Sequence, residues 1–375
     1  MSLMQLLPQI VFYSFVGVVF IQVCYYIFIF FRLAHYKIKE QNTVQEHPVS
    51  VIICAKNEAQ NIANNLPGFL VQDYKTTHEI IVVNDNSEDD TRYVIDEFKK
   101  TFKHINDLEL VQEAKLIMGK KFPLSMGIKS SKYETLLLSD ADCVPASEHW
   151  MKTMQSAYTK GKDIVLGYGA YFKQPGLLNK IIRFETFHTA LQYFSYALAG
   201  MPYMGVGRNL SYKRQLFFEN KGFSSINQIP SGDDDLFINK VATKTNTTIC
   251  IEHEAHTLSQ PKTSFKSWQL QKYRHFTTSK FYKTKHKFFL GTYSASFIML
   301  YPLLAASIVL YPIWWVPLCV FGVRFLLQAY TFNKAMKKLN ESDLFAWFWL
   351  LDIWMFIYHI IFIPALWRKP KASWN

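Results

Sequence analysis

Acidic and polar side chains follow three short apolar runs in the first half of the chain. Val49–Cys54 is followed by Ala55-Lys56-Asn57-Glu58, Glu79–Asn84 by Asp85-Asn86-Ser87, and Thr135–Ser139 by Asp140-Ala141-Asp142. Two carboxylates separated by one small residue on a turn can both face a single cation. Oxygen ligands favour Mg²⁺ or Mn²⁺, which also bind phosphate oxygens. A lone aspartate after a strand is more often a helix N-cap, but Asp85 at a neighbouring strand end reverses that preference.

Two adjacent lysines, Lys120 and Lys121, precede the third apolar run. Either can reach a diphosphate, although a solvated lysine pair is the commoner arrangement. The sequence contains neither GxGxxG nor GxxxxGK[ST]. Dinucleotide oxidoreductases and P-loop NTPases are therefore disfavoured.

Three consecutive carboxylates, Asp233, Asp234 and Asp235, stand in Ser231–Leu236 at an expected helix start. One or two acidic residues in this position complement the helix dipole. Three adjacent carboxylates repel one another unless one of them binds a cation or has a catalytic role. A carboxylate with a raised pKa can deprotonate a hydroxyl nucleophile, so one of the three is a candidate general base.

These residues belong to a block, 46–285, that contains no repeat and no low-complexity linker. Short β-rich runs alternate in it with helical patterns, which predicts strands at 49–54, 79–84, 108–112 and 135–139 and helices at 58–70 and 89–100. This alternation is typical of an α/β fold with a mostly parallel sheet. Ligands bind such sheets at the carboxyl ends of the strands, where the polar residues above are found.

The last part of the block, residues 263–287, mixes aromatic residues with basic ones. Ser264–Lys287 contains six lysines together with Gln271, Arg274 and His275. At helical spacing this pattern predicts an amphipathic basic helix on a membrane surface.

Long apolar stretches lie at both ends of the chain. The 375 residues carry 41 Lys+Arg against 29 Asp+Glu, a net charge of +12, yet half of them are hydrophobic and the mean hydropathy is +0.00. Residues 6–31, 288–311, 312–332 and 344–367 are candidate membrane segments. Arg32, Lys37 and Lys39 follow the first one, so the positive-inside rule puts the next domain in the cytoplasm. No basic residue precedes that run and no small-residue cleavage site follows it, which disfavours a signal peptide.

The last apolar stretch, 344–367, allows two topologies. A full span would carry Arg368, Lys369 and Lys371 to the outside, against the positive-inside rule. A re-entrant or interfacial helix would keep them inside, and Asp352 and His359 within the stretch are compatible with it.

The remaining candidate ligands are weak. The five cysteines form no CxxC pair, which indicates reduced structural thiols. His253 and His256 could ligate a metal, but a polar strand edge at Glu252–His256 is the favoured interpretation. No nucleic-acid motif accompanies the basic charge, which therefore indicates a membrane surface and an anionic substrate.

Taken in order, these motifs resemble the family 2 glycosyltransferases, in particular the membrane-bound branch with cellulose, chitin and hyaluronan synthases and ceramide glucosyltransferases. The resemblance covers residues of about 46–285 and implies a nucleotide-sugar-binding GT-A fold. It divides the chain into an N-terminal anchor (1–45), a cytosolic catalytic domain (46–262), the amphipathic helix (263–287) and a C-terminal membrane region (288–375).

The resemblance also assigns roles to the residues. Asp85 matches the aspartate that binds the uracil side of the nucleotide, and Asp140 and Asp142 match the DxD that holds metal and diphosphate. The residues expected to line the rest of the nucleotide pocket are Ala55, Asn57, Glu58 and Lys120.

Two family motifs are altered in this chain. Aligning the [TG]-E-D-x-x-L pattern on Leu236 makes Asp233 the general base, with Gly232 where Glu is usual and Asp234 as a competitor. The QxxRW motif retains Gln271 and Arg274, expected near diphosphate and acceptor, but has His275 in place of Trp. Because that Trp helps hold the growing chain in processive synthases, its loss disfavours polymer synthesis.

The resemblance implies an inverting, metal-dependent glycosyltransferase that moves a sugar from a UDP-sugar to a membrane lipid or lipid-linked glycan. We expect an integral protein of the bacterial inner membrane with a cytoplasmic catalytic domain. A small processive β-glycan synthase is the alternative. A catalytically silent nucleotide-binding scaffold is a third interpretation, disfavoured because all the motif carboxylates are present.

Overall fold

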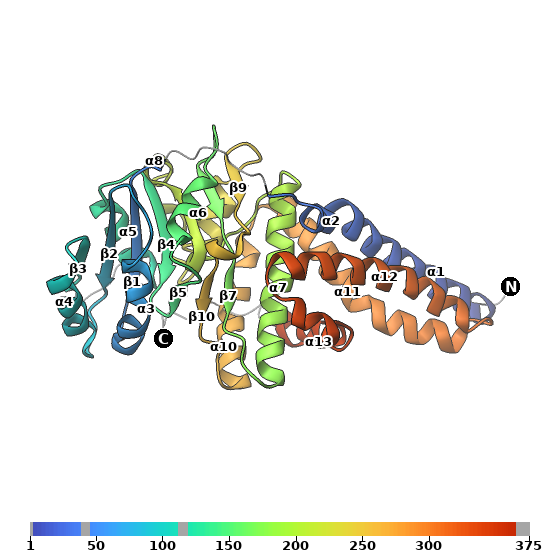
Figure 1. Ribbon diagram of the computed structural model, residues 1–375. Helices are drawn as coiled ribbons and strands as arrows, with labels where there is room; N and C mark the ends of the chain where they lie inside the picture. The colour runs from blue at the N-terminus through green and yellow to red at the C-terminus, as the bar shows by residue number, and fades with distance from the viewer. Residues whose placement is uncertain (1–2, 39–45, 112–118, 365–375) are drawn as a thin grey trace.

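The computed structural model describes residues 3–38, 46–111 and 119–364. An α/β domain forms one part of the molecule and a bundle of long helices forms the other (Figure 1). Lys39, Gln112, Arg368, Lys369 and Lys371 lie outside the described residues.

The central sheet of the domain has seven strands in the order β3-β2-β1-β4-β8-β6-β9. Its first four strands are parallel neighbours: β3 (Ile105–Glu109), β2 (His78–Asn84), β1 (Val49–Ala55) and β4 (Thr135–Asp140). β8 (Leu210–Lys213) is antiparallel to β4 and to β6 (Ile164–Leu166), which pairs in parallel with β9 (Thr247–Ile249). The predicted α/β fold with a mostly parallel sheet is confirmed.

Alternate side chains of β1 enter two different cores. Ile52 and Cys54 belong to one hydrophobic cluster, whereas Val51 and Ile53 belong to the other. Burial on both faces accounts for the unbroken apolar sequence of this strand. The helices nearest the parallel strands are α3 (Ala59–Leu70), α4 (Thr91–Thr101), α5 (Lys121–Ser130) and α6 (Trp150–Ser156).

Three predicted boundaries differ from the structure. The first two helices begin at Ala59 and Thr91 rather than at Glu58 and Asp89. Asp89 precedes its helix because its Oδ1 accepts the Thr91 N–H at 3.0 Å. The third strand ends earlier than predicted because its parallel register pairs Ile105 with Ile80.

A small second sheet lies beside the end of β4. It contains β5 (Cys143–Pro145), β10 (Thr257–Ser259) and β7 (Gly169–Tyr171), with β10 in the middle. The segment Glu252–His256 is not the predicted strand edge, because His253–Ala255 forms a 3₁₀ turn before β10. The remaining short helices of the domain are α8 (Arg214–Glu219) and α9 (Asp235–Val241).

Helix α7 (Leu177–Leu198) stands between the domain and the helical bundle (Figure 1). It is buried on nearly all sides, and its buried positions include charged and polar residues as well as apolar ones. Its buried Arg183 pairs with Glu341 Oε2 at 2.5 Å and with Asp343 Oδ1 at 2.7 Å. These two acids follow the bundle helix α12 (Trp315–Lys338), so the ion pairs fasten the bundle to the domain.

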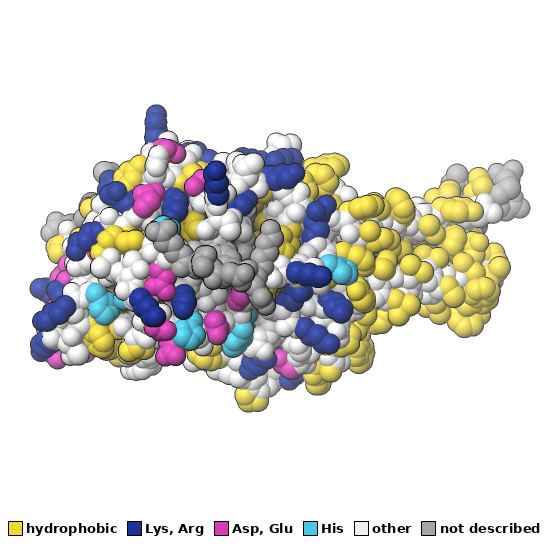
Figure 2. All heavy atoms as spheres, turned by 45° about the horizontal axis from the view of Figure 1, so that its top comes forward, with side chains coloured by type: hydrophobic (Ala, Val, Ile, Leu, Met, Phe, Trp, Pro, Cys, Tyr) yellow, Lys and Arg dark blue, Asp and Glu magenta, His cyan; other side chains and the backbone are white. Residues whose placement is uncertain are grey.

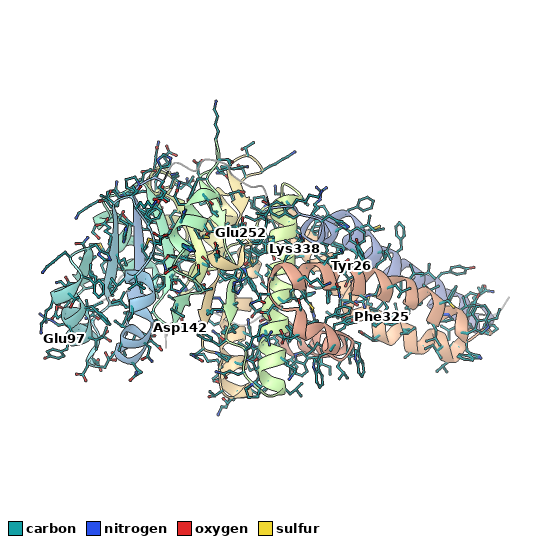
Figure 3. The ribbon with its side chains drawn as sticks, viewed as in Figure 1. Tyr26, Glu97, Asp142, Glu252, Phe325 and Lys338 are labelled. Carbon is teal, nitrogen blue, oxygen red and sulfur yellow. The ribbon has the colours of Figure 1, made fainter. Side chains whose placement is uncertain are left out.

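Four helical stretches are long and apolar enough to cross a membrane: Leu6–Ala34, Thr284–Leu310, Trp315–Lys338 and Ser342–Phe362. The first comprises α1 (Leu3–Tyr25), a π-turn (Tyr26–Phe30) and α2 (Phe31–Ala34), and the next two are α11 and α12. Figure 2 shows the bundle surface as almost entirely hydrophobic, with Lys and Arg gathered where it meets the domain. In Figure 3, Tyr26 and Phe325 lie in the bundle, whereas Asp142 lies in the domain.

The predicted amphipathic helix over 263–287 is shorter in the structure. Helix α10 covers Phe265–Phe276, a 3₁₀ turn follows at Ser279–Phe281, and α11 begins at Thr284. The Ser264 hydroxyl caps α10 by accepting the Ser267 N–H at 3.2 Å.

The last apolar segment forms a 3₁₀ turn (Ser342–Trp347) and the 15-residue helix α13 (Phe348–Phe362). Fifteen residues rise about 22 Å, less than the hydrocarbon core of about 30 Å. The first turn of α13 packs on α12, with Phe325 and Phe348 centroids 5.0 Å apart. Its last turn packs on α10, with Phe276 and Phe362 stacked at 5.3 Å. Helix α13 alone is thus shorter than a membrane span, but the whole segment Ser342–Phe362 is long enough for one, so the choice between the two topologies rests on the positive-inside rule.

The two isolated charges of the membrane segments meet in the bundle. Arg324 Nη1 lies 2.7 Å from Asp352 Oδ2, and both side chains are buried. Gln328 Nε2 and the Tyr301 hydroxyl each donate to Asp352 at 2.6 Å. The cluster therefore satisfies both oxygens of the carboxylate and ties α13 to α11 and α12.

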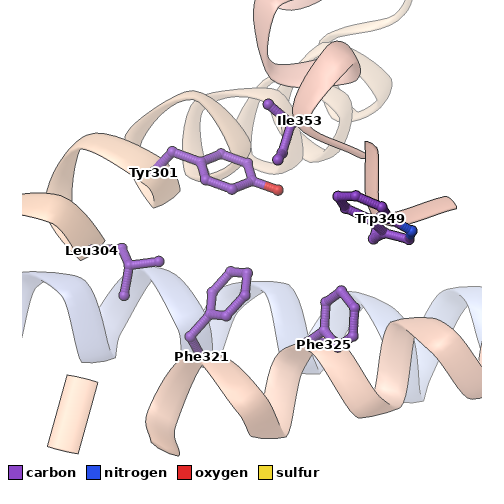
Figure 4. A pocket seen from close by; sticks show the side chains of 6 residues that line it. All are labelled: Tyr301, Leu304, Phe321, Phe325, Trp349 and Ile353. Atoms are coloured by element: carbon purple, nitrogen blue, oxygen red, sulfur yellow. The ribbon is translucent and has the colours of Figure 1, made fainter. Parts of the chain in front are cut away.

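A groove of about 370 Å³ lies between α11, α12 and α13 (Figure 4). It is lined by apolar and aromatic side chains: Tyr301, Leu304, Phe321, Phe325, Trp349 and Ile353. Tyr301 also belongs to the Asp352 cluster, so this polar cluster adjoins the groove.

We predict that Asp352→Ala destabilises the protein by about 3–5 kcal/mol, because it leaves the buried Arg324 without its counter-charge. Arg324→Met with Asp352→Leu should be milder, since neither charge then remains. Thermal unfolding of the detergent-solubilised protein measures both. Arg92→Ala is the control, because its exposed pair with Glu109 contributes about 0–1 kcal/mol. Asp352→Ala with wild-type stability would contradict the prediction.

Candidate active site

The loops after β1 and β2 are joined by backbone and side-chain hydrogen bonds. The Asp85 N–H donates to the Ala55 carbonyl at 2.8 Å, and the Asn57 N–H donates to Ser87 Oγ at 2.9 Å. Asn57 adopts a positive φ of 55°, which asparagine tolerates better than most residues. These contacts place Ala55, Asn57 and the buried Asp85 side by side, as the parallel sheet requires.

Asp140 and Asp142 lie at the end of β4, directly beside the end of β1. The register pairs Asp140 with Cys54, and the buried Ala141 makes the turn between the two carboxylates compact. Ligand atoms of Asp140, Asp142 and Cys143 lie within 4.8 Å of one another. Carboxylate oxygens suit Mg²⁺ or Mn²⁺, so this group can hold a divalent cation. The Cys143 thiol is 2.9 Å from Ser259 Oγ and donates to Asp142 Oδ1 at 3.4 Å.

The two carboxylates experience opposite electrostatic environments. Burial opposes the charge of Asp140, but Lys120, Arg208 and Arg274 together lower its pKa. Burial and the neighbouring charge of Asp140 raise the pKa of Asp142. Glu58 faces the same pair, because burial and the charges of Asp142 and Asp140 raise its pKa. A divalent cation would relieve this repulsion among like charges.

The two adjacent lysines have separate environments. Lys120 forms an ion pair with Asp140, which outweighs the effect of burial and raises the pKa of Lys120. Lys121 is fully buried and donates to the carbonyls of Ile229 and Ser231. The structure thus places Lys120 at the metal-site carboxylates and Lys121 under the loop that leads to Asp233.

The three consecutive acids also differ. Asp234 caps α9: its Oδ1 accepts the Asp235 N–H and its Oδ2 accepts the Gly207 N–H, each at 2.7 Å. Asp235 Oδ2 accepts the hydroxyls of Thr278 at 2.5 Å and Tyr282 at 2.7 Å. The structure records no hydrogen bond to Asp233 within its described residues. Its charge acts on Cys54 and Lys120, so it faces the end of β1.

Burial and the flanking carboxylates raise the pKa of Asp234 to about 8. Burial likewise raises the pKa of Asp235. Both hydrogen-bonded acids therefore ionise less readily than a solvated aspartate.

Helix α10 presents Gln271, Arg274 and His275 at i, i+3 and i+4, which puts them on one face. An adjoining side of the helix is fixed, because the buried Lys272 forms an ion pair with Glu185 of α7. Arg274 acts electrostatically on Asp140. His275 is exposed and lies near Arg274 and Arg208.

Sequence reasoning missed Arg208 and Cys143. Arg208 lies in the loop before β8, and its charge lowers the pKa of both Asp140 and Asp142. The signal that could have identified it is a lone arginine after Gly207 and two residues before a strand. His253 and His256 do not belong to the Asp140 group, and burial lowers the pKa of His256 to about 4.

Residues 50–217 match the family described as Glycosyl transferase family 2. This stretch of the chain is similar to a family 2 glycosyltransferase domain. The resemblance inferred from the motifs is thereby confirmed, and the matched range contains Asn57, Asp85, Lys120, Asp140 and Asp142. The acidic run at 233–235 and helix α10 lie beyond the matched range.

Three relatives illustrate the likeness. Poly-beta-1,6-N-acetyl-D-glucosamine synthase of Staphylococcus epidermidis is 36% identical over 126 residues, which are 32% of this chain and 28% of the synthase. Glycosyltransferase AglE of Haloferax volcanii is 29% identical over 140 residues, 37% of this chain and 44% of AglE. The matched region thus spans less than half of either relative.

The third relative is a solved structure, a mannosyltransferase of Pyrobaculum calidifontis in complex with GDP-Man and Mn²⁺. It superposes with a TM-score of 0.56 over 95% of this chain and 99% of the other, at 15% identity. At that identity the likeness supports the GT-A fold of the family 2 domain and nothing finer.

We predict that substitutions of the two adjacent lysines have different effects. Lys121→Met should lower the unfolding free energy by about 1–3 kcal/mol, because two buried carbonyls lose their donor. Lys120→Met should leave stability nearer to wild type but weaken binding of a metal–nucleoside diphosphate complex. Thermal unfolding and calorimetric titration with UDP and Mn²⁺ measure the two effects. The reverse pattern would show that the two roles are exchanged.

Proposed function

We propose that the protein is an inverting glycosyltransferase that transfers a sugar from a nucleotide-diphosphate sugar to a hydroxyl of a membrane lipid or lipid-linked glycan. The observation that carries the proposal is the division of the acidic run. Asp234 and Asp235 are occupied by hydrogen bonds of the fold, whereas Asp233 faces Lys120 and the end of β1. Asp233 is thus the carboxylate available to accept a proton.

The nucleotide-binding side of the site consists of the loops after β1 and β2. Asp85, Asn57 and Ala55 would contact the base and ribose, and the family resemblance favours uridine. Asp140 and Asp142 would hold the divalent cation, which neutralises the diphosphate as it leaves. Lys120 lies next to Asp140 and keeps that carboxylate ionised.

In the proposed reaction the acceptor hydroxyl loses its proton to the Asp233 carboxylate and attacks the anomeric carbon. The bond from that carbon to the diphosphate oxygen breaks on the opposite face. Arg274 on α10 stabilises the charge that develops on the leaving diphosphate, a contribution that is large when the donor is pre-positioned. An α-linked donor then gives a β-linked product.

The membrane bundle supports a lipid acceptor. Helix α10, with Gln271, Arg274 and His275, packs on α13 through Trp268 and Phe276. The acceptor side of the site is therefore built against a membrane-embedded helix. The apolar groove between α11, α12 and α13 could hold part of a lipid chain. The basic residues at the junction of bundle and domain favour a cytoplasmic catalytic domain, in a bacterial inner membrane.

A small processive polysaccharide synthase is the second candidate. Its support is the 36% identity to a poly-beta-1,6-N-acetyl-D-glucosamine synthase over 126 residues. Against it, His275 stands where processive members of the family carry tryptophan. The three C-terminal membrane segments also offer few helices with which to build a secretion channel.

We predict that Asp233→Asn lowers the transfer rate by about 10²–10⁴-fold, because the general base is lost. Nucleotide binding should stay near the wild-type value, since the β1 and β2 loops are unchanged. Rates with labelled donor and calorimetric titration with UDP measure the two properties. Asp234→Asn is the matched variant and should retain more activity. Normal turnover by Asp233→Asn together with an inactive Asp234→Asn would move the base to Asp234.

The length of the product separates the two candidate functions. Purified protein, a panel of nucleotide sugars and a membrane lipid extract should give a lipid carrying one added sugar, detected by mass spectrometry. A ladder of oligomers would instead establish the processive alternative. The absence of transfer from every donor would contradict both.

A further inference from the structure

Arg208 is fixed beside the metal-site carboxylates by the strand register. β4 and β8 are antiparallel, with Leu138 opposite Leu210. Arg208 belongs to the 3₁₀ turn (Gly207–Asn209) that leads directly into β8. The Ser139 hydroxyl donates to the Arg208 carbonyl at 3.1 Å, and the Thr257 hydroxyl donates to it at 2.9 Å. The backbone of Arg208 is thus held from both the large and the small sheet.

The side chain of Arg208 lies across the small sheet. A Cβ atom at Gly169 would come within 2.3 Å of Arg208 Nε, so the side chain rests directly on the backbone of β7. The guanidinium then stacks on Tyr171, with its carbon 4.4 Å from the ring centroid. In this sheet Tyr171 and Cys143 flank Ser259 on either side, and the guanidinium interacts electrostatically with Cys143 and Asp142.

The Arg208 guanidinium has donors to spare for a ligand. An arginine has five N–H donors in a fork that fits phosphate oxygens. Within the described residues, Arg208 forms no salt bridge at 4 Å or less, and its guanidinium contacts Tyr171. Lys120 differs, because it is already paired with Asp140.

The charge balance of the site calls for such a cation. The carboxylates of Asp140 and Asp142 cancel the charge of one divalent ion, which leaves the charge of a bound diphosphate uncompensated. Lys120 is paired with Asp140, and among the described residues Arg208, Arg274 and Lys262 also act electrostatically on these carboxylates. Of these, Arg208 has a side chain held in place by both a glycine and an aromatic ring.

We propose that Arg208 binds the diphosphate of the nucleotide-sugar donor, opposite the cation held by Asp140 and Asp142. Gly169 and Tyr171 pre-position its side chain for this contact. Asp234 helps to hold the backbone next to Arg208, because its Oδ2 accepts the N–H of the neighbouring residue Gly207. This inference rests on the proposed function, since it names a further diphosphate ligand of the same site.

The test compares UDP with uridine in calorimetric titrations of the full-length protein with Mn²⁺. Arg208→Ala should weaken UDP binding by about 10–100-fold, the loss expected for a charged hydrogen bond. Uridine binding should not change, because uridine lacks the diphosphate. Arg208→Lys should recover part of the UDP affinity, since it keeps the charge without the fork and the stacking.

Gly169→Ala provides an independent variant, because it retains the arginine and only displaces its side chain. It should weaken UDP binding in the same direction without weakening uridine binding. Arg92→Ala, at an exposed ion pair on α4, is the charge-matched control and should bind UDP as the wild type does.

The outcomes separate this inference from the proposed function. Wild-type binding of UDP with equal binding by Arg208→Ala would overturn the role of Arg208 and leave the proposed function standing. Equal losses of UDP and uridine affinity would also overturn it, because they would indicate a disturbed pocket. A wild-type protein that binds neither UDP nor GDP would instead contradict the proposed function.

Discussion

The parallel pairing of β1 with both β2 and β4 is the constraint on which the site depends. Because the three strands share a direction, their polar ends meet at one edge of the sheet. Asn57, Asp85 and Asp140 are far apart in sequence, yet the register places Asp140 opposite Cys54 and a backbone hydrogen bond joins Asp85 to Ala55. No single loop carries the chemistry, and a change in register would disperse it.

The resulting concentration of acids is stabilised in three ways. Lys120 pairs directly with Asp140. Asp234 accepts hydrogen bonds from two backbone N–H groups, and Asp235 accepts them from two hydroxyl groups. Burial raises the pKa of both acids. The remaining negative charge of the carboxylates can be neutralised by a divalent cation. The arginines nearby can then balance the negative charge of a diphosphate bound to that cation. The negative charge of the site is thus suited to a metal–diphosphate complex.

Much of this arrangement could be predicted from the sequence, because strands buried on both faces form continuous apolar runs. The DxD turn at Asp140 is readable for the same reason. Tertiary contacts decide the rest: Lys120 and Lys121 are equivalent in sequence, and only packing sends Lys121 beneath the Ile229–Ser231 loop. Arg324 and Asp352 are isolated charges in sequence but an ion pair in the bundle. Arg208 was missed because the position of its side chain depends on a glycine and a tyrosine of another strand.

The membrane bundle and the catalytic domain meet through buried polar contacts rather than a linker. Glu185 of α7 pairs with Lys272 of α10 and accepts the Tyr358 hydroxyl of α13 at 3.2 Å. Direct displacement by an acceptor hydroxyl at this junction is the central claim. The measurement that tests it most directly is the anomeric configuration of the product formed from an α-linked donor, determined by NMR. The account predicts a β-linked sugar, and an α-linked product would contradict it.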